Sequence, residues 1–286
     1  MIMSPPLMDV RIERSELLKV AQALPAAPRI FARVSALLND ENSSIDEITS
    51  LLKRDPALTA RILRMSNSVA YAGNEPVDSL DEAVQRVGFG DTYRIVGFAT
   101  AAQVVQQHLG FYGVSAAQFR ENALLTALIM ERLADLAGLD TRSAYTAGLL
   151  RSIGKVALNR LGASRAGPGS YEDDGHGPLL EWEMSRCGTD NAQVAALVLE
   201  EWRFPAATVQ AVGAHYAPAE TSPPLAKLLN VAAAAAERCG HGWPGEWSYW
   251  EGSAKWLDLL SMGEDLVQES VREALEAFGP VRAAVG

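Results

Sequence analysis

Two polar side chains stand at the centre of an otherwise apolar stretch that runs Gly148-Leu149-Leu150-Arg151-Ser152-Ile153-Gly154-Lys155. Arg151 is a permanent cation with no lone pair to donate, and Ser152 offers only a neutral hydroxyl. Divalent transition metals select imidazole, thiolate and carboxylate ligands instead. The chain also lacks GxGxxG, Walker A, GxSxG and HExxH motifs, so the common nucleotide, serine-hydrolase and zincin sites miss their first requirement. The stretch therefore favours a structural role over catalysis.

The composition is that of a globular protein of one large domain or two joined subdomains, and we favour the second. The chain has 286 residues, of which 48% are hydrophobic and 21% charged, enough to bury a substantial core. Cys187 and Cys239 form no CxxC pair, which predicts buried thiols rather than a disulfide framework or a zinc site. We expect no cofactor.

Charge and hydropathy exclude several partners. The net charge is −10, which argues against sequence-independent binding to nucleic acid or to an anionic membrane. No apolar run is long enough and free enough of charge to span a bilayer. Met1 to Val10 has no basic region followed by a long apolar core, so it does not resemble a signal peptide. We therefore expect a cytoplasmic protein.

Caps and apolar periodicity predict an all-α fold. Ser44 to Glu47 and Ser79 to Glu82 are typical of capping boxes, and Asp55 precedes a proline at the first helical position. A long helix is expected from about 117 to 137, and a second from Asp140 or Thr141 to about 161. The Gly- and Ser-rich stretch 162–177 predicts a surface loop in which His176 is solvated. No strand alternation competes with this pattern.

These landmarks resemble the HDOD family, the non-catalytic relatives of the HD superfamily of metal-dependent phosphohydrolases. The matching segments, in order, are Leu24-Pro25, Arg54 to Thr59, Ile62 to Arg64, Asn67-Ser68, Ala83-Val84, Val87-Gly88, and the helix with "GLL" before and "IGK" after the central pair. The resemblance implies a two-lobed helical fold whose second lobe is HD-like. We expect an N-terminal extension (1–14), a first lobe (15–112), a second lobe (113–240) and a Trp-rich C-terminal extension (241–286), with the lobes meeting near 109–117.

The resemblance also implies where a metal site has been lost. In HD enzymes, His and Asp residues from several helices hold divalent metals that activate water. The corresponding positions of this chain are Asn122, Arg151, Ser152, Asn191 and His215. One imidazole is left, so we expect a degenerate metal site, no bound metal and no catalytic residue. Arg151 is expected to pair with Glu183 or Asp190, replacing a metal-centred crosslink by a charge-assisted one.

Three functions remain open. The first is a non-catalytic bacterial signalling module that binds signalling or regulatory proteins. The second is a sensor in which Arg151 binds the phosphate of a nucleotide or cyclic dinucleotide without hydrolysis. The third is an atypical phosphohydrolase or phosphodiesterase, against which the missing ligands count. The tryptophans of the C-terminal extension also have two interpretations, core anchors or an exposed partner surface: Trp243, Trp247, Trp250 and Trp256.

Overall fold

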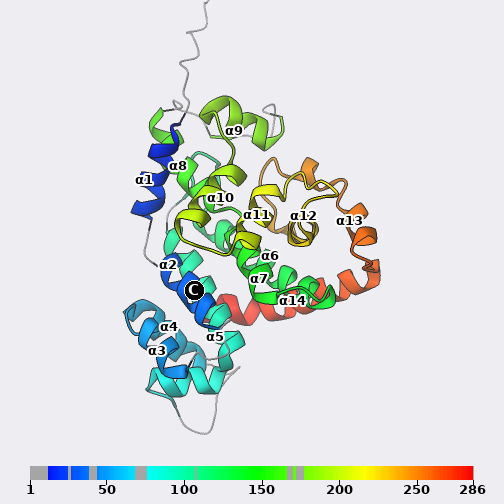
Figure 1. The fold of residues 1–286 in the computed structure, drawn as a ribbon. Coiled ribbons are helices and arrows are strands. Elements are labelled where there is room, and N and C mark those ends of the chain that lie inside the picture. The colour runs from blue at the N-terminus through cyan, green and yellow to red at the C-terminus, as the bar shows by residue number, and fades with distance from the viewer. Residues whose placement is uncertain are drawn as a thin grey trace, which may run out of the picture.

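The computed structural model describes residues 12–24, 27–38, 44–67, 76–106, 108–165, 170–171 and 177–285. Over these residues the fold is all-α, as predicted (Figure 1). The only β-type pairing there is one antiparallel bridge between Leu109 and Val114, in the turn that leads from the first half of the chain to the second. His176 and part of the expected 162–177 loop lie outside the described residues.

The first half of the chain forms five helices: α1 (Arg14–Ala23), α2 (Ala27–Leu38), α3 (Ile45–Leu52), α4 (Pro56–Ser66) and α5 (Leu80–Val104). The starts of α3, α4 and α5 follow the predicted caps Ser44, Asp55 and Ser79, whereas α1 begins after Glu13. The Ser44 side chain accepts the Glu47 N–H in a complete capping box, and the Asp55 carboxylate accepts the Leu58 N–H at 3.1 Å. Gly88 has φ +82° and kinks α5, since glycine tolerates a positive φ.

The second half contains the remaining elements: α6 (Ala116–Leu136), α7 (Thr141–Leu150), α8 (Ile153–Arg165), α9 (Leu179–Cys187), α10 (Asn191–Glu201), α11 (Ala206–Ala214), α12 (Pro224–Ala236), a π-turn η1 (Glu237–His241), a 3₁₀ turn η2 (Trp247–Trp250), α13 (Ala254–Leu259) and α14 (Glu264–Val285). Among the described residues, none of these helices combines the length and the apolar character needed to cross a bilayer.

The expected single helix from 140 to 161 was wrong. The structure has two helices that meet at Arg151 and Ser152, and α8 continues to Arg165. The Lys155 N–H bonds to the Ser152 carbonyl three residues earlier, at 3.0 Å, which is the tighter 3₁₀ pattern. Helical periodicity continues through this junction in the sequence, so the break was not visible there. It places both central side chains where the two helices join.

Two glycines of the central stretch allow close helix packing. A Cβ on Gly148 would lie 2.7 Å from the Ala127 backbone of α6, and one on Gly154 would lie 1.9 Å from the Asn191 carbonyl oxygen at the start of α10. Backbones this close exclude every side chain except that of glycine. The glycines of "GLL" and "IGK" therefore fix α7 against α6 and α8 against α10.

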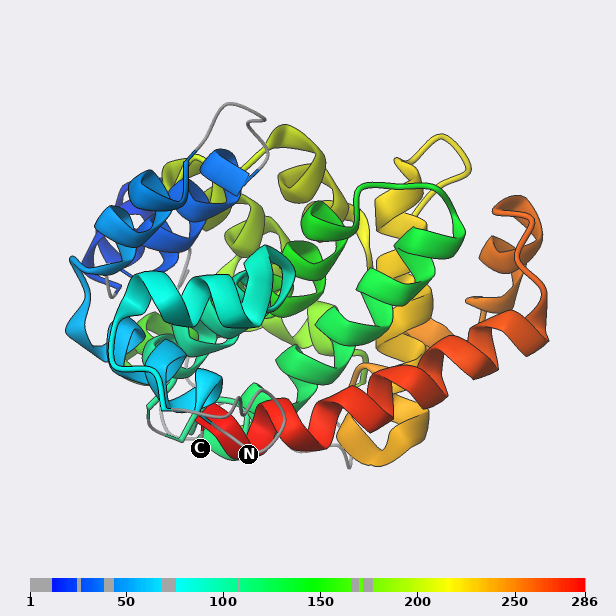
Figure 2. The same cartoon turned by 90° about the horizontal axis from the view of Figure 1, so that it is seen from below.

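The chain termini tie the two halves together. In both views α14 runs beneath α6 and reaches α4 and α5, which it contacts (Figures 1 and 2). At the other end α1 packs on α8 and α10, and the Trp202 indole N–H donates to the Ala21 carbonyl at 3.2 Å. The four-part division of the chain stays a prediction, and these contacts group α1 with the second half.

Replacing Gly154 by alanine is expected to lower the free energy of unfolding by about 3 kcal/mol, because the new methyl group collides with backbone that side-chain motion cannot clear. Gly213→Ala in α11 is the matched control, since its Cβ would meet only the Ala196 methyl at 3.4 Å. Urea denaturation of both variants measures the difference. Equal stability of the two variants would show that α8 and α10 are not held this close.

Candidate functional site

Arg151 is closed off from solvent at the junction of α7 and α8, with a side chain that is 1% exposed. Its two terminal nitrogens bond to the Glu246 carboxylate, Nη1 to Oε1 at 3.3 Å and Nη2 to Oε2 at 3.0 Å. Nη2 also donates to the Asn122 side-chain oxygen of α6 at 2.9 Å. This fork-on-fork geometry is the strongest form of the arginine–carboxylate pair.

Lys155, one helical turn further along, is bound by the same carboxylate. Its ammonium lies 2.5 Å from Glu246 Oε1, 2.8 Å from the Tyr216 hydroxyl and 3.4 Å from the Asn191 side-chain oxygen. The Lys155 and Glu246 side chains are 0% and 1% exposed. Arg151, Lys155 and Glu246 are called the ionic cluster below.

The ionic cluster joins elements that are distant in the sequence. Arg151 and Lys155 come from the α7–α8 junction, while Glu246 lies just before η2 in the C-terminal extension. Asn122 of α6 and Asn191, the first residue of α10, supply the neutral oxygens around the two cations. One carboxylate therefore connects the C-terminal extension to the core of the second half.

The predicted partner of Arg151 was wrong: the acid is Glu246, and neither Glu183 nor Asp190 is bonded to the guanidinium. Glu183 accepts the Tyr112 hydroxyl at 2.7 Å and the Asn191 backbone and side-chain N–H groups at 2.7 and 2.9 Å. Asp190 caps α10 by accepting the backbone N–H of the third residue after it. Both acids are occupied locally, and the extension brings a third acid that spacing alone did not reveal.

Mutual charge stabilises the ionised form of Glu246. Burial by itself raises the pKa of this carboxyl, but the charges of Arg151 and Lys155 together outweigh burial and hold the pKa at about 2. Burial lowers the pKa of Lys155, and the Arg151 charge adds to that decrease. Burial also raises the pKa of Glu183 to about 7, although the Lys155 charge opposes it. Two cations and one fully ionised acid thus share the centre.

The implied metal positions do not fit a divalent metal. Asn122 and Asn191 are amides already bonded to the cations, and Arg151 is itself a cation. Ser152 and His215 are buried, and their Oγ and Nε2 atoms have no hydrogen-bond partner among the described residues. These two uncharged atoms are the remaining possible metal ligands, and the positive charges of Arg151 and Lys155 would repel a divalent cation bound to them. Across the described residues, no group of three or more His, Cys, Asp or Glu side chains has metal-binding geometry.

His215 is held as a neutral structural residue. Its Nδ1 lies 2.7 Å from the Val212 carbonyl, so this nitrogen carries the proton. Burial, followed by the Arg151 charge, lowers the pKa of the imidazole to about 3. The ring stacks near Trp250 at a centroid distance of 6.1 Å.

Three of the four C-terminal tryptophans belong to the core, so the partner-surface interpretation was wrong for them. Trp243, Trp250 and Trp256 are 4%, 5% and 3% exposed, whereas Trp247 is 61% exposed. The Lys155 ammonium lies 4.6 Å from the Trp243 ring centroid, and the Arg151 guanidinium carbon lies 5.8 Å from that of Trp250. These rings exclude water and add cation–π attraction to the ionic cluster.

Sequence reasoning missed Glu246 and the role of Lys155. Lys155 was noted only as the last letter of "IGK". Glu246 stands three residues after Trp243 and directly before Trp247. The available signal was an acid between two tryptophans that could be core anchors, because a buried carboxylate needs a cationic partner.

Comparison with known proteins assigns the chain to a family. The model of the HDOD domain matches residues 24–218, and Glu246 lies beyond that match. A search of curated proteins gave no significant match. A structure from Shewanella amazonensis SB2B, named "Putative phosphohydrolase", is 25% identical, with 95% of this chain and 97% of that chain covered and a TM-score of 0.66.

Two further solved structures share the fold. A "Putative signal transduction protein" from Marinobacter aquaeolei VT8 is 23% identical, with a TM-score of 0.70, over 98% of this chain and 63% of that one. An HDOD domain protein of unknown function from Geobacter sulfurreducens is 22% identical, with a TM-score of 0.64, over 96% and 98%. The HDOD model covers well over half of the sequence, so the chain belongs to the HDOD family.

Proposed function

We propose that this HDOD protein is a non-catalytic signalling module that acts by binding regulatory proteins. The observation that carries the proposal is the ionic cluster, which fills the place where the family relationship implies a metal. Arg151 and Glu246 are each 1% exposed and bonded to each other. A phosphate ester and its attacking water would need room and a Lewis acid at this point. The space is instead filled by a guanidinium, an ammonium and their shared carboxylate.

The ionic cluster takes over the crosslinking that a metal would provide. A metal bound by several helices fixes their relative positions, and Glu246 does the same for α8 and the C-terminal extension. In such a module, the shape of the binding surface is maintained by the ionic cluster and does not require a bound metal. The net charge of −10 favours protein partners over nucleic acid.

The two alternative functions receive less support. Phosphate binding by Arg151 requires a free guanidinium, and this one is buried and bonded to Glu246 and Asn122. Hydrolysis by an atypical site requires ligands that Asn122 and Asn191 do not supply. The name of the Shewanella structure nevertheless makes hydrolysis the activity to test.

Glu246→Gln is expected to lower the free energy of unfolding by about 3 kcal/mol, because two buried cations lose their shared carboxylate. Glu251→Gln removes the same charge from an exposed position five residues along and should change it by less than about 0.5 kcal/mol. Chemical denaturation gives both values. Similar losses in the two variants would mean that the ionic cluster does not hold the C-terminal extension in place.

Purified protein is expected to carry no stoichiometric transition metal and to leave nucleotides and cyclic dinucleotides intact. Elemental analysis and product chromatography test this directly. The double variant Arg151→His, Ser152→Asp should stay inactive, because two other implied ligand positions remain amides. One metal per chain in the wild type, with hydrolysis that disappears on chelation, would refute the non-catalytic proposal.

Trp247 is the one tryptophan of the extension that remains a candidate for the partner surface, since exposed aromatic side chains often anchor interfaces. Affinity capture from the native cell with wild-type bait should recover specific proteins that Trp247→Ala bait recovers several-fold less. Glu251→Gln serves again as the control from the same segment. Equal recovery by all three baits would remove Trp247 from the proposed surface.

A further inference from the structure

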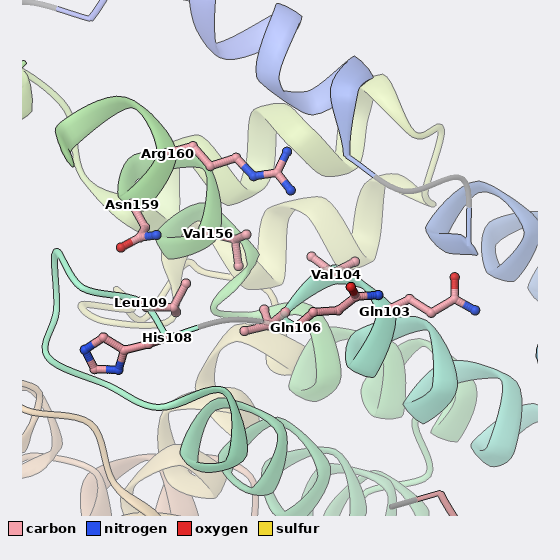
Figure 3. Close-up of a pocket in the computed structure, with 9 residues that line it drawn as sticks. Gln103, Val104, Gln106, His108, Leu109, Val156, Asn159 and Arg160 are labelled. Atoms are coloured by element: carbon pink, nitrogen blue, oxygen red, sulfur yellow. The ribbon is translucent and has the colours of Figure 1, made fainter. Parts of the chain in front are cut away.

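A polar cavity of about 290 Å³ lies beside α8. It lies where the end of α5 and the segment after it pass beneath α8 (Figure 3). Helix α8 contributes Val156, Asn159 and Arg160. The crossing segment contributes Gln103, Val104, Val105, Gln106, His108 and Leu109. The cavity therefore touches both halves of the chain.

The lining is rich in hydrogen-bond donors and carries no acid among the described residues that form it. Arg160 supplies a guanidinium, and the amides of Gln103 and Gln106 add further donors. The Asn159 side-chain oxygen already accepts the Phe111 N–H at 2.9 Å. Figure 3 shows the Asn159 amide nitrogen turned the other way, toward the remaining lining residues. Such a lining suits an anion.

The surroundings strengthen the positive character of this corner in a chain whose net charge is −10. An Arg120 terminal nitrogen donates to the Val105 carbonyl in the cavity wall at 3.3 Å, and Arg61 lies near enough to Arg120 for their charges to interact. One acid stands close by, Asp55, whose carboxylate accepts the Gln103 amide at 3.4 Å. A concave site with an excess of one charge concentrates ligands of the opposite sign.

We propose that this cavity binds a small phosphorylated metabolite, of about the size of a sugar phosphate, through Arg160 and the neighbouring amides. A tetrahedral phosphate accepts several hydrogen bonds from different directions, and arginine matches it with two parallel N–H groups. The volume is at the lower end for small-molecule sites, which suits a short phosphate ester. The ligand would bridge α8 and the segment that joins the two halves. This inference does not depend on the absence of catalysis.

Calorimetric titration of the full chain with ribose 5-phosphate tests the proposal, with ribose and succinate as the matched probes without phosphate. Saturable one-to-one binding of ribose 5-phosphate is expected, with much weaker binding of the other two. Arg160→Gln should weaken that binding by about tenfold or more, the loss typical of one charge-assisted contact. Arg14→Gln removes the same charge from a side chain that is 73% exposed and far along the chain, and should bind as the wild type does.

Three results would overturn the proposal. The first is no saturable binding of ribose 5-phosphate at millimolar concentration, and the second is equal affinity for succinate. The third is equal weakening by Arg160→Gln and Arg14→Gln, which would indicate general charge attraction. Arg160 is exposed, so both variants are expected to fold, and their melting curves confirm this before titration.

Discussion

The structure depends on one buried carboxylate placed between two buried cations. An unpaired charge in a protein interior is strongly destabilising, and a charge pair there is tolerated only with good geometry and further hydrogen bonds. Glu246 meets this condition by accepting from Arg151 and Lys155, while Asn122, Asn191 and Tyr216 complete the coordination of the two cations. These groups come from different elements, so the ionic cluster connects α6, α8 and α10 to the C-terminal extension.

The need to neutralise two buried cations explains why the C-terminal segment carries a buried acid. A C-terminal segment that only covered apolar surface would need no buried acid. Glu246 of this segment is nevertheless buried in the ionic cluster, and the Trp243 and Trp250 rings lie over its two cations. The two rings shield the charges from water, which strengthens the attraction among them. The segment is therefore part of the core, even though the HDOD match ends at residue 218.

Within the central stretch, the glycines and the polar pair Arg151 and Ser152 meet different physical requirements. Gly148 and Gly154 are needed because neighbouring backbones leave no room for a Cβ, and that requirement persists whatever lies between them. The central pair of the stretch, Arg151 and Ser152, is under no such steric requirement, provided that a buried charge there is compensated. The buried guanidinium of Arg151 is compensated in this way by the carboxylate of Glu246.

The sequence by itself determined the helical class, most helix starts and the family. Caps such as Ser44 and Asp55, and the glycines of the central stretch, act over a few residues, so their effects can be read locally. It also identified Arg151 as a cation that needs an acid. Only the tertiary structure decided which acid, because Glu183 and Asp190 are taken by nearby N–H and hydroxyl groups, and Glu246 arrives from 95 residues away. The break at Ser152 and the burial of three tryptophans were likewise decided by packing between distant segments, which short-range patterns do not encode.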